Sequence, residues 1–309
     1  MDPIQKVYLV GLGAVGSAYA AKMNEAEPDL VKVIVDQQRF AAYQQQEIRV
    51  NGKPCRFPLV TPEQATEKAD LILIAVKGHH LAEAITLIRP FVGEKTIIMS
   101  LLNGITSEEE IGKVYGAEKL LHAFVVSTDA TREGRSTRYS NLGRIVFGDK
   151  DDPTSPKVLA VKALFDRTGV PYTIPPDILR ELWWKFMLNV GLNQVSAILK
   201  APYGVFHKVK EARELMVLAC QEVLQIAQRM GINLTTADID GYHEVIGQLA
   251  PEGKTSMLQD VEAGRKTEVE SFAWTVVALG EKYGIPTPVN ACLGRMIAVL
   301  EQTYGLDTW

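Results

Sequence analysis

A glycine-rich motif near the N-terminus constrains the fold of this chain more than any other feature of its 309 residues. The apolar run Lys6–Val10 is typical of a buried parallel strand, and a helical pattern runs from Ser17 to Glu25. Between them stands a G-x-G-x-x-G motif, which consists of Gly11, Leu12, Gly13, Ala14, Val15 and Gly16. Glycines at this spacing permit a tight turn, close approach of a pyrophosphate and close packing of the helix on the strand. We therefore expect the motif to bind a dinucleotide; a glycine-rich turn in another doubly wound domain is the alternative.

Asp36 ends the second predicted strand, Val31–Val35, about 20 residues after the motif, where an acid that binds the ribose is expected. A carboxylate at this position favours the free 2′-hydroxyl of NAD and repels the 2′-phosphate of NADP. Arg39 follows three residues later and could bind a phosphate instead. From these residues alone, the prediction leans towards NAD, with Asp36 as a cofactor-binding residue.

Two polar residues follow predicted core strands, at the strand ends where open parallel sheets bind their ligands. Lys77 ends the clearest apolar strand pattern in the chain, and Asn103 lies just after the run Thr96–Ser100. Both are therefore expected beside the cofactor. The alternatives are a solvated lysine at a strand end and a simple Asn-Gly turn. His79 and His80 have no Cys or acidic partner at ligand spacing, so we expect loop histidines and no metal site.

Hairpins are predicted at two further places in the first half of the chain. Asn51-Gly52 suits a tight turn between Ile48–Val50 and the run Pro54–Val60. His122–Ser127 and Arg144–Phe147 have the pattern of two strands joined by a polar hairpin that contains glycine. These strands complete a predicted α/β first half.

The stretch Leu182–Leu199 has the pattern of a mostly apolar helix with a polar stripe. Lys185, Asn189 and Asn193 recur at every fourth residue and so lie on one helix face. Because most other side chains are large and apolar, the helix is expected to be buried on most sides. A lysine and two amides in such a helix cost free energy unless something polar faces them. Either neighbouring protein groups pair with them, or they form the floor of a substrate cleft.

Everything after Asp177 predicts helix, and Pro175-Pro176 is the predicted linker because proline interrupts both helix and sheet. We therefore expect an N-terminal Rossmann-type domain with a doubly wound α/β sheet, residues 1–175, that binds the dinucleotide. An all-α C-terminal domain, residues 176–309, would carry substrate and catalytic residues.

The segment Thr267–Glu270 predicts a capping box that opens a helix reaching Tyr283. This places Glu268 in the first turn, where the helix dipole favours a carboxylate. Such an acid is a natural partner for a buried lysine such as Lys185, although an ordinary first-turn acid is the alternative. Burial should lower the pKa of the lysine towards neutrality, and the carboxylate should limit the fall.

Composition and charge argue against several classes of function. A net charge of −4 gives no electrostatic basis for binding nucleic acid or an anionic membrane. No apolar run reaches the roughly 18 residues of a spanning helix, and the N-terminus lacks a signal-peptide pattern. Cys55, Cys220 and Cys292 are odd in number and widely spaced, which fits reduced thiols. We therefore expect a cytoplasmic protein.

Taken in order, these motifs resemble those of the ketopantoate reductase family (2-dehydropantoate 2-reductase), over essentially the whole chain. The matching segments are the glycine motif, Ala75-Val76-Lys77, Asn103-Gly104, Trp184-Lys185 with Asn189 and Asn193, and Ser256–Asp260 with Arg265, Thr267 and Glu268. The last two sets are the specific ones. The resemblance implies a Rossmann domain followed by a helical domain, and reduction of 2-dehydropantoate to pantoate with NADPH, a step towards coenzyme A.

The resemblance also implies roles for individual residues. Lys185 looks like the general acid, and Glu268 like the group that holds the substrate and orients that lysine. The implied substrate-binding residues are Asn103, Asn189, Asn193 and Ser256. Asn103 and Lys77 fall near the nicotinamide end of the cofactor.

Two departures from the family pattern keep alternatives open. Asp36 stands where the family usually has a basic residue, so NAD stays open beside NADP. Gly78-His79-His80 replaces a Thr or Ala followed by Gln, which bears on cofactor contacts and substrate. A related oxidoreductase of the same fold could act on another 2-keto or hydroxy acid. A non-catalytic dinucleotide-binding protein is the second alternative, which the polar stripe and Glu268 disfavour. The expected partner is a small 2-keto acid, and a homodimer is compatible with these motifs.

Overall fold

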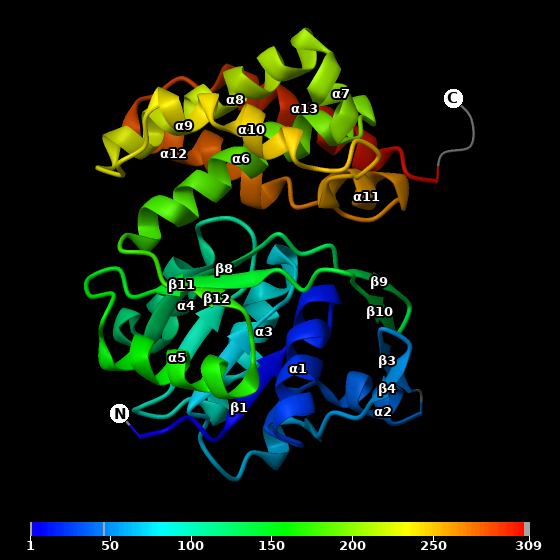
Figure 1. The fold of residues 1–309 in the computed structure, drawn as a ribbon, viewed down its shortest axis with the longest axis vertical. Coiled ribbons are helices and arrows are strands. Elements are labelled where there is room, and N and C mark those ends of the chain that lie inside the picture. Colours follow the sequence, from blue (N-terminus) through cyan, green and yellow to red (C-terminus); the bar gives the residue numbers. More distant parts are fainter. Residues whose placement is uncertain (1, 46, 306–309) are drawn as a thin grey trace. The chain divides into compact units, whose positions relative to one another are not determined.

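The computed structural model describes residues 2–45 and 47–305, which form two compact units (Figure 1). The first unit contains the chain up to Asn103 and the segment Ser107–Ile178. The second contains Gly104–Thr106 and the described chain from Leu179 onward. The chain therefore changes units just after the predicted linker, and the assignment of Gly104–Thr106 to the second unit was not predicted.

Within the described residues, the first unit is built on an eight-stranded sheet with the order β12-β11-β8-β7-β6-β1-β2-β5. Its strands are β1 Val7–Val10, β2 Val31–Ile34, β5 Leu59–Val60, β6 Leu71–Ile74, β7 Ile97–Ser100, β8 Leu120–Val126, β11 Arg144–Gly148 and β12 Tyr172–Thr173. Neighbours are parallel except β8 and β11, which are antiparallel. Successive side chains point to opposite faces, so Val7 and Leu9 join one hydrophobic cluster while Tyr8 and Val10 join another. Burial on both faces explains the continuous apolar runs, and the predicted Rossmann-type α/β fold is confirmed.

Helices cover both faces of this sheet (Figure 1). They are α1 Ala14–Ala26, α2 Gln37–Gln45, α3 Leu81–Leu87, α4 Ser107–Tyr115 and α5 Pro156–Thr168. Short 3₁₀ turns lie at Pro62–Gln64, Gly78–His80, Arg89–Phe91 and Ala117–Lys119. Buried side chains of α1 and α5 belong to one hydrophobic cluster, and those of α3 and α4 to the other. The sheet is therefore sandwiched between two helical layers, as in other doubly wound folds.

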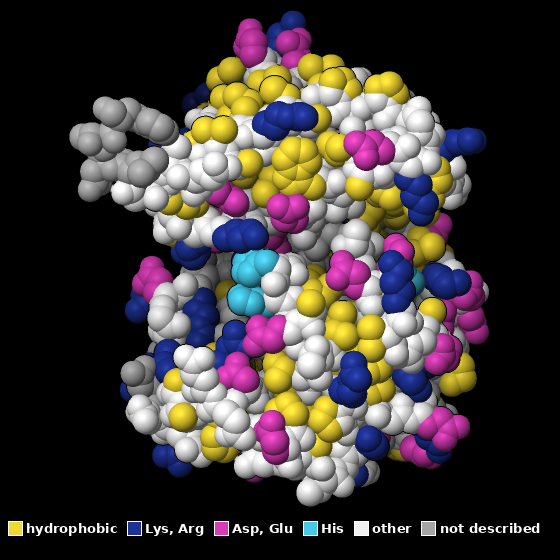
Figure 2. Space-filling model, turned by 180° about the vertical axis from the view of Figure 1, so that it is seen from behind, with side chains coloured by type: hydrophobic (Ala, Val, Ile, Leu, Met, Phe, Trp, Pro, Cys, Tyr) yellow, Lys and Arg dark blue, Asp and Glu magenta, His cyan; other side chains and the backbone are white. Residues whose placement is uncertain are grey.

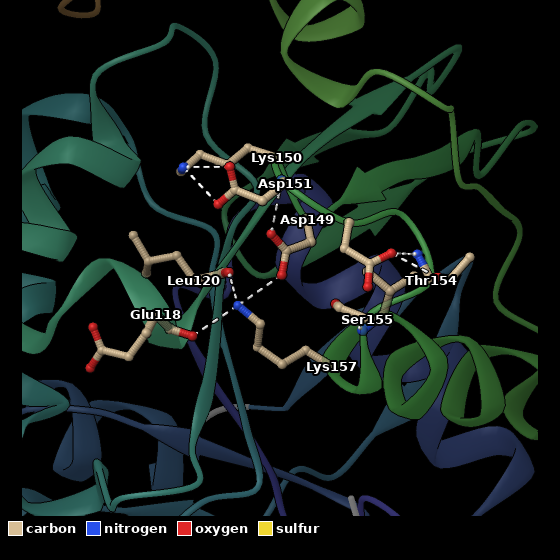
Figure 3. A network of polar contacts seen from close by, with 10 residues as sticks. Glu118, Leu120, Asp149, Lys150, Asp151, Thr154, Ser155 and Lys157 are labelled. Carbon is tan, nitrogen blue, oxygen red and sulfur yellow. Dashed lines mark hydrogen bonds and ion pairs between the residues drawn. The ribbon is translucent and has the colours of Figure 1, made fainter.

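Lys157 connects α5 to the antiparallel end of the sheet (Figure 3). Its ammonium donates to the backbone oxygens of Glu118 at 2.8 Å and Leu120 at 3.1 Å. It also lies 3.0 Å from the carboxylate of Asp149, which follows β11. Only 19% of the lysine side chain and 14% of the aspartate side chain are exposed, so this ion pair is screened less than a surface pair. One cation thus joins the helix to β8 and to the end of β11.

A second, smaller sheet has the order β4-β3-β10-β9 within the described residues. Its strands are β3 Ile48–Val50, β4 Lys53–Cys55, β9 Thr131–Glu133 and β10 Ser136–Arg138. Asn51 and Gly52 have φ angles of 49° and 77°, so the predicted Asn-Gly hairpin is confirmed. The prediction of one strand over Pro54–Val60 is wrong, because only the start pairs with β3 while Leu59–Val60 joins β2. The polar segment between β8 and β11 supplies β9 and β10.

The described part of the second unit is helical and contains no strand, as predicted. Its elements are α6 Ile178–Leu199, α7 Tyr203–Lys208, α8 Lys210–Arg229, α9 Thr236–Asp240, α10 Tyr242–Gly247, α11 Ser256–Glu262, a π-helical turn Glu270–Trp274, α12 Thr275–Tyr283 and α13 Pro288–Gln302. The sequence pattern predicts one helix over Thr236–Leu249, which is wrong, because the structure has two helices here, α9 and α10, separated at Gly241. Glycine weakens a helix interior, which accounts for the break.

Candidate functional site

The glycine motif has the close backbone approach that its spacing predicts. Gly11 follows β1 with φ +99°, and a Cβ atom there would lie 2.4 Å from the backbone oxygen of Ala75. A Cβ atom on Gly16 would lie 1.9 Å from the backbone oxygen of Gly11. Gly13 is the N-cap of α1, which has neither a side-chain cap nor an acid in its first turn. The backbone N–H groups at the start of α1 are therefore available to an anion, and the cradle fits a dinucleotide pyrophosphate.

Asp36, just after β2, is held by Arg39. One carboxylate oxygen accepts the backbone N–H of Arg39 at 2.6 Å, and the other lies 2.8 Å from its guanidinium. The same guanidinium nitrogen contacts Glu83 of α3 at 2.5 Å. The hydrogen bond to Glu83 is the main cause that raises the pKa of Arg39. Because one cation is shared by two carboxylates, this cluster carries no surplus positive charge.

Lys77 and Asn103 occupy equivalent positions on neighbouring strands. The last residues of β6 and β7, Ile74 and Ser100, are register partners, and each candidate lies three residues beyond its strand. Gly11 follows β1, the neighbour of β6 on its other side. The three residues therefore follow the carboxyl ends of adjacent parallel strands, where such sheets bind ligands. Both Lys77 and Asn103 are partly buried.

His79 and His80 lie in the 3₁₀ turn after Lys77 and are exposed. His80 lies 3.4 Å from the carboxylate of Glu83. Across the described part of the chain, no cluster of three or more His, Cys, Asp or Glu side chains is placed to hold a metal ion.

Lys185 and Glu268 interact electrostatically within the second unit. Lys185 lies on α6 and is partly buried, whereas Glu268 is buried, with 6% of its surface exposed. Burial lowers the pKa of Lys185 to about 8, and the Coulombic effect of Glu268 opposes the fall. A lysine with this pKa is a better proton donor than an exposed one and is still mostly protonated at neutral pH.

Asn189 and Asn193 continue the polar stripe along α6. Asn189 is partly buried, and Asn193 is buried with 8% of its surface exposed. On one side of the stripe, Phe186 and Val190 pack in the hydrophobic core of the unit. The stripe thus presents one ammonium and two amides from a mostly apolar helix, an arrangement suited to a small polar ligand.

The segment around Glu268 differs from the predicted capping box. The N–H and hydroxyl of Thr267 both donate to Glu301 of α13, at 2.7 Å and 2.6 Å. The Thr267 hydroxyl in turn accepts the backbone N–H of Val269 at 3.2 Å, not that of Glu270. The helix begins with the π-helical turn Glu270–Trp274, so the capping-box prediction is wrong. A long-range anchor to α13, which local sequence does not encode, holds Glu268 at the start of this turn.

Ser256 is the exposed first residue of α11, and its neighbour Thr255 carries the structural contacts. The hydroxyl of Thr255 accepts the backbone N–H of Leu258 at 3.1 Å and lies 3.1 Å from the hydroxyl of Ser196. Ser196 lies on α6, three residues after Asn193. These contacts bring the start of α11 to the C-terminal end of the polar stripe.

A buried network that sequence reasoning missed fixes α6 against two other helices. Glu222 of α8 accepts the backbone N–H groups of Val289 and Asn290 at 2.8 Å and 3.0 Å. The side-chain amide of Asn290 donates to Glu222 at 2.7 Å, and its oxygen accepts Gln194 of α6 at 3.1 Å. Gln194 adjoins Asn193, so the network sets the rotation of α6 about its axis. The sequence signal that could have indicated this network is Pro288-Val289-Asn290 at the start of α13.

A cavity of about 480 Å³ lies elsewhere in the first unit, lined by residues of α2 and of the segment from β3 to β5. It contains none of the residues predicted to bind cofactor or substrate. In residues 2–45 and 47–305, no helix has both the length and the apolarity needed to cross a membrane.

Two family models match the chain in sequence. The one described as ketopantoate reductase PanE/ApbA matches residues 7–152, and the one described as ketopantoate reductase PanE/ApbA C terminal matches residues 177–301. A 2-dehydropantoate 2-reductase of Aquifex aeolicus is 29% identical over 316 residues, covering 99% of this chain and 100% of that protein.

Solved structures share the whole fold. A dimeric ketopantoate reductase from Staphylococcus aureus superimposes with a TM-score of 0.82 at 20% identity, covering 97% of this chain and 100% of its own. A D-mandelate dehydrogenase in complex with NADH gives a TM-score of 0.87 at 20% identity, with the same coverages of 97% and 100%. At these identities the likeness establishes a common fold.

Proposed function

The chain belongs to the ketopantoate reductase family, and from this premise we propose that it reduces 2-dehydropantoate to pantoate. As a member of the family it is an oxidoreductase acting on a CH–OH group with a nicotinamide dinucleotide. The observation that carries the substrate proposal is the pairing of Lys185, with a pKa of about 8, and the buried Glu268 within the helical unit. A 2-keto acid needs a proton donor of this kind when its carbonyl is reduced.

The residues have distinct roles in the proposed reaction. When bound, the dinucleotide supplies the hydride that reduces the carbonyl carbon. Lys185 donates a proton to the carbonyl oxygen as negative charge grows there, a contribution typically worth about 10²–10⁴ in rate. Glu268 stabilises the ammonium form of Lys185 between turnovers. Asn189, Asn193, Asn103 and Ser256 are the proposed hydrogen-bonding partners of the substrate, and amides suit this role because they add no charge.

Cofactor binding is assigned to the first unit. The backbone of Gly11–Gly16 would hold the pyrophosphate, and Lys77 and Asn103 would lie towards the nicotinamide. Asp36 would accept hydroxyls of the adenosine ribose. The backbone clashes that a Cβ atom would cause at Gly11 and Gly16 support this assignment.

A second candidate is reduction of another 2-keto acid by the same residues. The Gly78–His80 turn, whose two histidines are exposed and which departs from the usual family pattern, favours it. The likeness in fold to an NADH-bound D-mandelate dehydrogenase is consistent with it. A homodimer and a cytoplasmic location belong to the same proposal; the first draws on the dimeric relative from Staphylococcus aureus.

The test is a cofactor-oxidation assay with 2-dehydropantoate and a panel of other 2-keto acids, each with NADH and with NADPH. Lys185→Ala should lower kcat by about 10²-fold or more, because the proton donor is lost. Lys208→Ala is the matched control, since it removes an exposed lysine of the same unit. Near-normal turnover by Lys185→Ala would refute the role of the lysine. If another 2-keto acid is turned over faster, that acid replaces 2-dehydropantoate as the proposed substrate.

A further inference from the structure

Two arginines of the β9–β10 hairpin have unpaired, buried guanidinium nitrogens. The Nη1 atoms of Arg132 and Arg135 are buried and have no hydrogen-bond partner. Nε of Arg132 donates to the backbone oxygen of Gly134 at 2.9 Å, and the guanidinium of Arg135 stacks 4.9 Å from the centre of the Tyr43 ring. Within the described residues, neither arginine forms an ion pair with a carboxylate. Their positive charges are therefore uncompensated.

Such a pair is costly in the absence of an anion. Burial is the main cause that lowers the pKa of Arg132, and the charge of Arg135 lowers it further, while Tyr43 acts in the opposite direction. Arginine nevertheless stays protonated in proteins, so burial of these charges destabilises the folded chain. When a charged group is buried, a donor without a hydrogen-bond partner loses its hydrogen bonds to water and gains none from the protein. Both guanidinium groups interact with Tyr43, and two such donors on one hairpin are suited to an oxyanion with several acceptor oxygens.

The hairpin places these atoms beside the expected dinucleotide site. Arg132 is the register partner of Thr137, so both side chains lie on the same face of the hairpin. The hydroxyl of Thr137 lies 2.7 Å from that of Ser17 in α1, the helix that the glycine motif opens. Tyr43 lies one helical turn after Arg39, the residue that contacts Asp36. The pair therefore lies between the start of α1 and the α2 helix, on the adenosine side of the motif.

The charges around the end of β2 also favour an anion site at the β9–β10 hairpin. Arg39 is already shared by Asp36 and Glu83 and brings no surplus positive charge. A phosphate arriving there would need cations from elsewhere in the unit. Figure 2 is turned by 180° from Figure 1, and it shows Lys and Arg side chains on the side of the first unit where β9 and β10 lie. Arg132, in β9, and Arg135, in the turn before β10, carry buried Nη1 atoms without a hydrogen-bond partner.

We propose that Arg132 and Arg135 bind a phosphate monoester, and that its source is the 2′-phosphate on the adenosine ribose of the dinucleotide. The inference rests on the proposed dinucleotide-binding function and extends it to cofactor choice. Bound between two guanidinium groups, the phosphate accepts the hydrogen bonds that both Nη1 atoms lack. The attraction of the two arginines for the phosphate thereby exceeds its repulsion by Asp36, so the protein prefers NADPH to NADH.

The test compares adenosine 2′,5′-bisphosphate with adenosine 5′-monophosphate, which differ only in the 2′-phosphate. Calorimetric titrations use the full-length protein, its Arg132→Gln and Arg135→Gln variants and the control Arg138→Gln. Arg138 is an exposed arginine of the same hairpin, so its removal makes the same change in charge. The wild type and the control should bind the bisphosphate at least about tenfold more tightly than the monophosphate. Either glutamine variant should lose most of this ratio and keep its affinity for the monophosphate.

Other results would overturn the inference in distinguishable ways. Equal affinity of the wild type for the two nucleotides would refute the 2′-phosphate site while leaving dinucleotide binding intact. Binding of neither would refute both. If inorganic phosphate binds in a manner that depends on the arginines while the two nucleotides bind alike, the site serves a free phosphate and the assignment to the cofactor is wrong. If a glutamine variant does not fold, Arg135→Lys replaces it, because lysine keeps the charge but lacks the planar fork. The lysine variant should also lose most of the ratio.

Discussion

Glu268→Gln tests the electrostatic coupling on which the proposed proton transfer depends. Lys185 has a pKa of about 8, compared with an ordinary value of 10.5, even though Glu268 works against the fall. The difference of about 2.5 corresponds to roughly 3 kcal/mol in favour of the neutral amine. A carboxylate close to a cation typically changes the pKa of that cation by about 1–3. Removing the charge of Glu268 should therefore lower the pKa of Lys185 further below its wild-type value.

The sign of the effect on activity follows from the role of the lysine. Reduction needs the protonated amine, so wild-type kcat should be constant at low pH and fall as the pH rises through about 8. In Glu268→Gln the fall should come at a pH lower by about 1–3. At pH 7 about nine-tenths of wild-type Lys185 is protonated, compared with about half or less in the variant, a loss of at least about twofold. Activity should recover as the pH is lowered.

The assay is the pH dependence of kcat for 2-dehydropantoate reduction at saturating cofactor. Glu270→Gln is the matched control, because Glu270 is an exposed acid two residues further along the chain. Its profile should match that of the wild type. A Glu268→Gln profile whose midpoint stays at or above the wild-type value would show that the charge of Glu268 does not act on Lys185. A lower plateau alone would not support the coupling, since lost substrate contacts could produce it.

Three further substitutions test the architecture around the site. Gly16→Ala places a Cβ atom 1.9 Å from a backbone oxygen of the motif, so fluorescence titration should find dinucleotide affinity reduced at least about tenfold. The control Gly247→Ala introduces a Cβ atom that meets no atom within 4 Å, and it should leave this affinity unchanged. Gly191→Ala brings a Cβ atom to 2.4 Å from Sγ of Cys220, so urea unfolding should show a loss of about 1–3 kcal/mol; unchanged stability would contradict the close packing of α6 on α8. Asn290→Ala removes one of the two acceptors of the Gln194 amide, which keeps its hydrogen bond to the backbone oxygen of Val190. The variant should cost about 1–3 kcal/mol in the same assay, with a drop in kcat/KM that Cys220→Ala does not produce.

The elements that could be predicted from sequence are those encoded by short stretches of chain. The strand before Gly11 and the glycine spacing itself predict the nucleotide cradle, because steric exclusion of Cβ atoms acts over a few residues. The four-residue repeat of Lys185, Asn189 and Asn193 predicts a polar stripe, because helix geometry alone places such residues on one face. Family resemblance added roles to these residues from motifs of the same local kind.

Tertiary structure alone decided which groups meet across long stretches of sequence. Thr267 is anchored by Glu301 instead of closing a local capping box, and Asn290 is held by Glu222. Arg132 and Arg135 belong to a polar segment that suggested only a hairpin, and their uncompensated charge depends on burial against α2. Local patterns determine backbone conformation, but burial and pairing of charges depend on neighbours brought together by folding, and these set the pKa of Lys185.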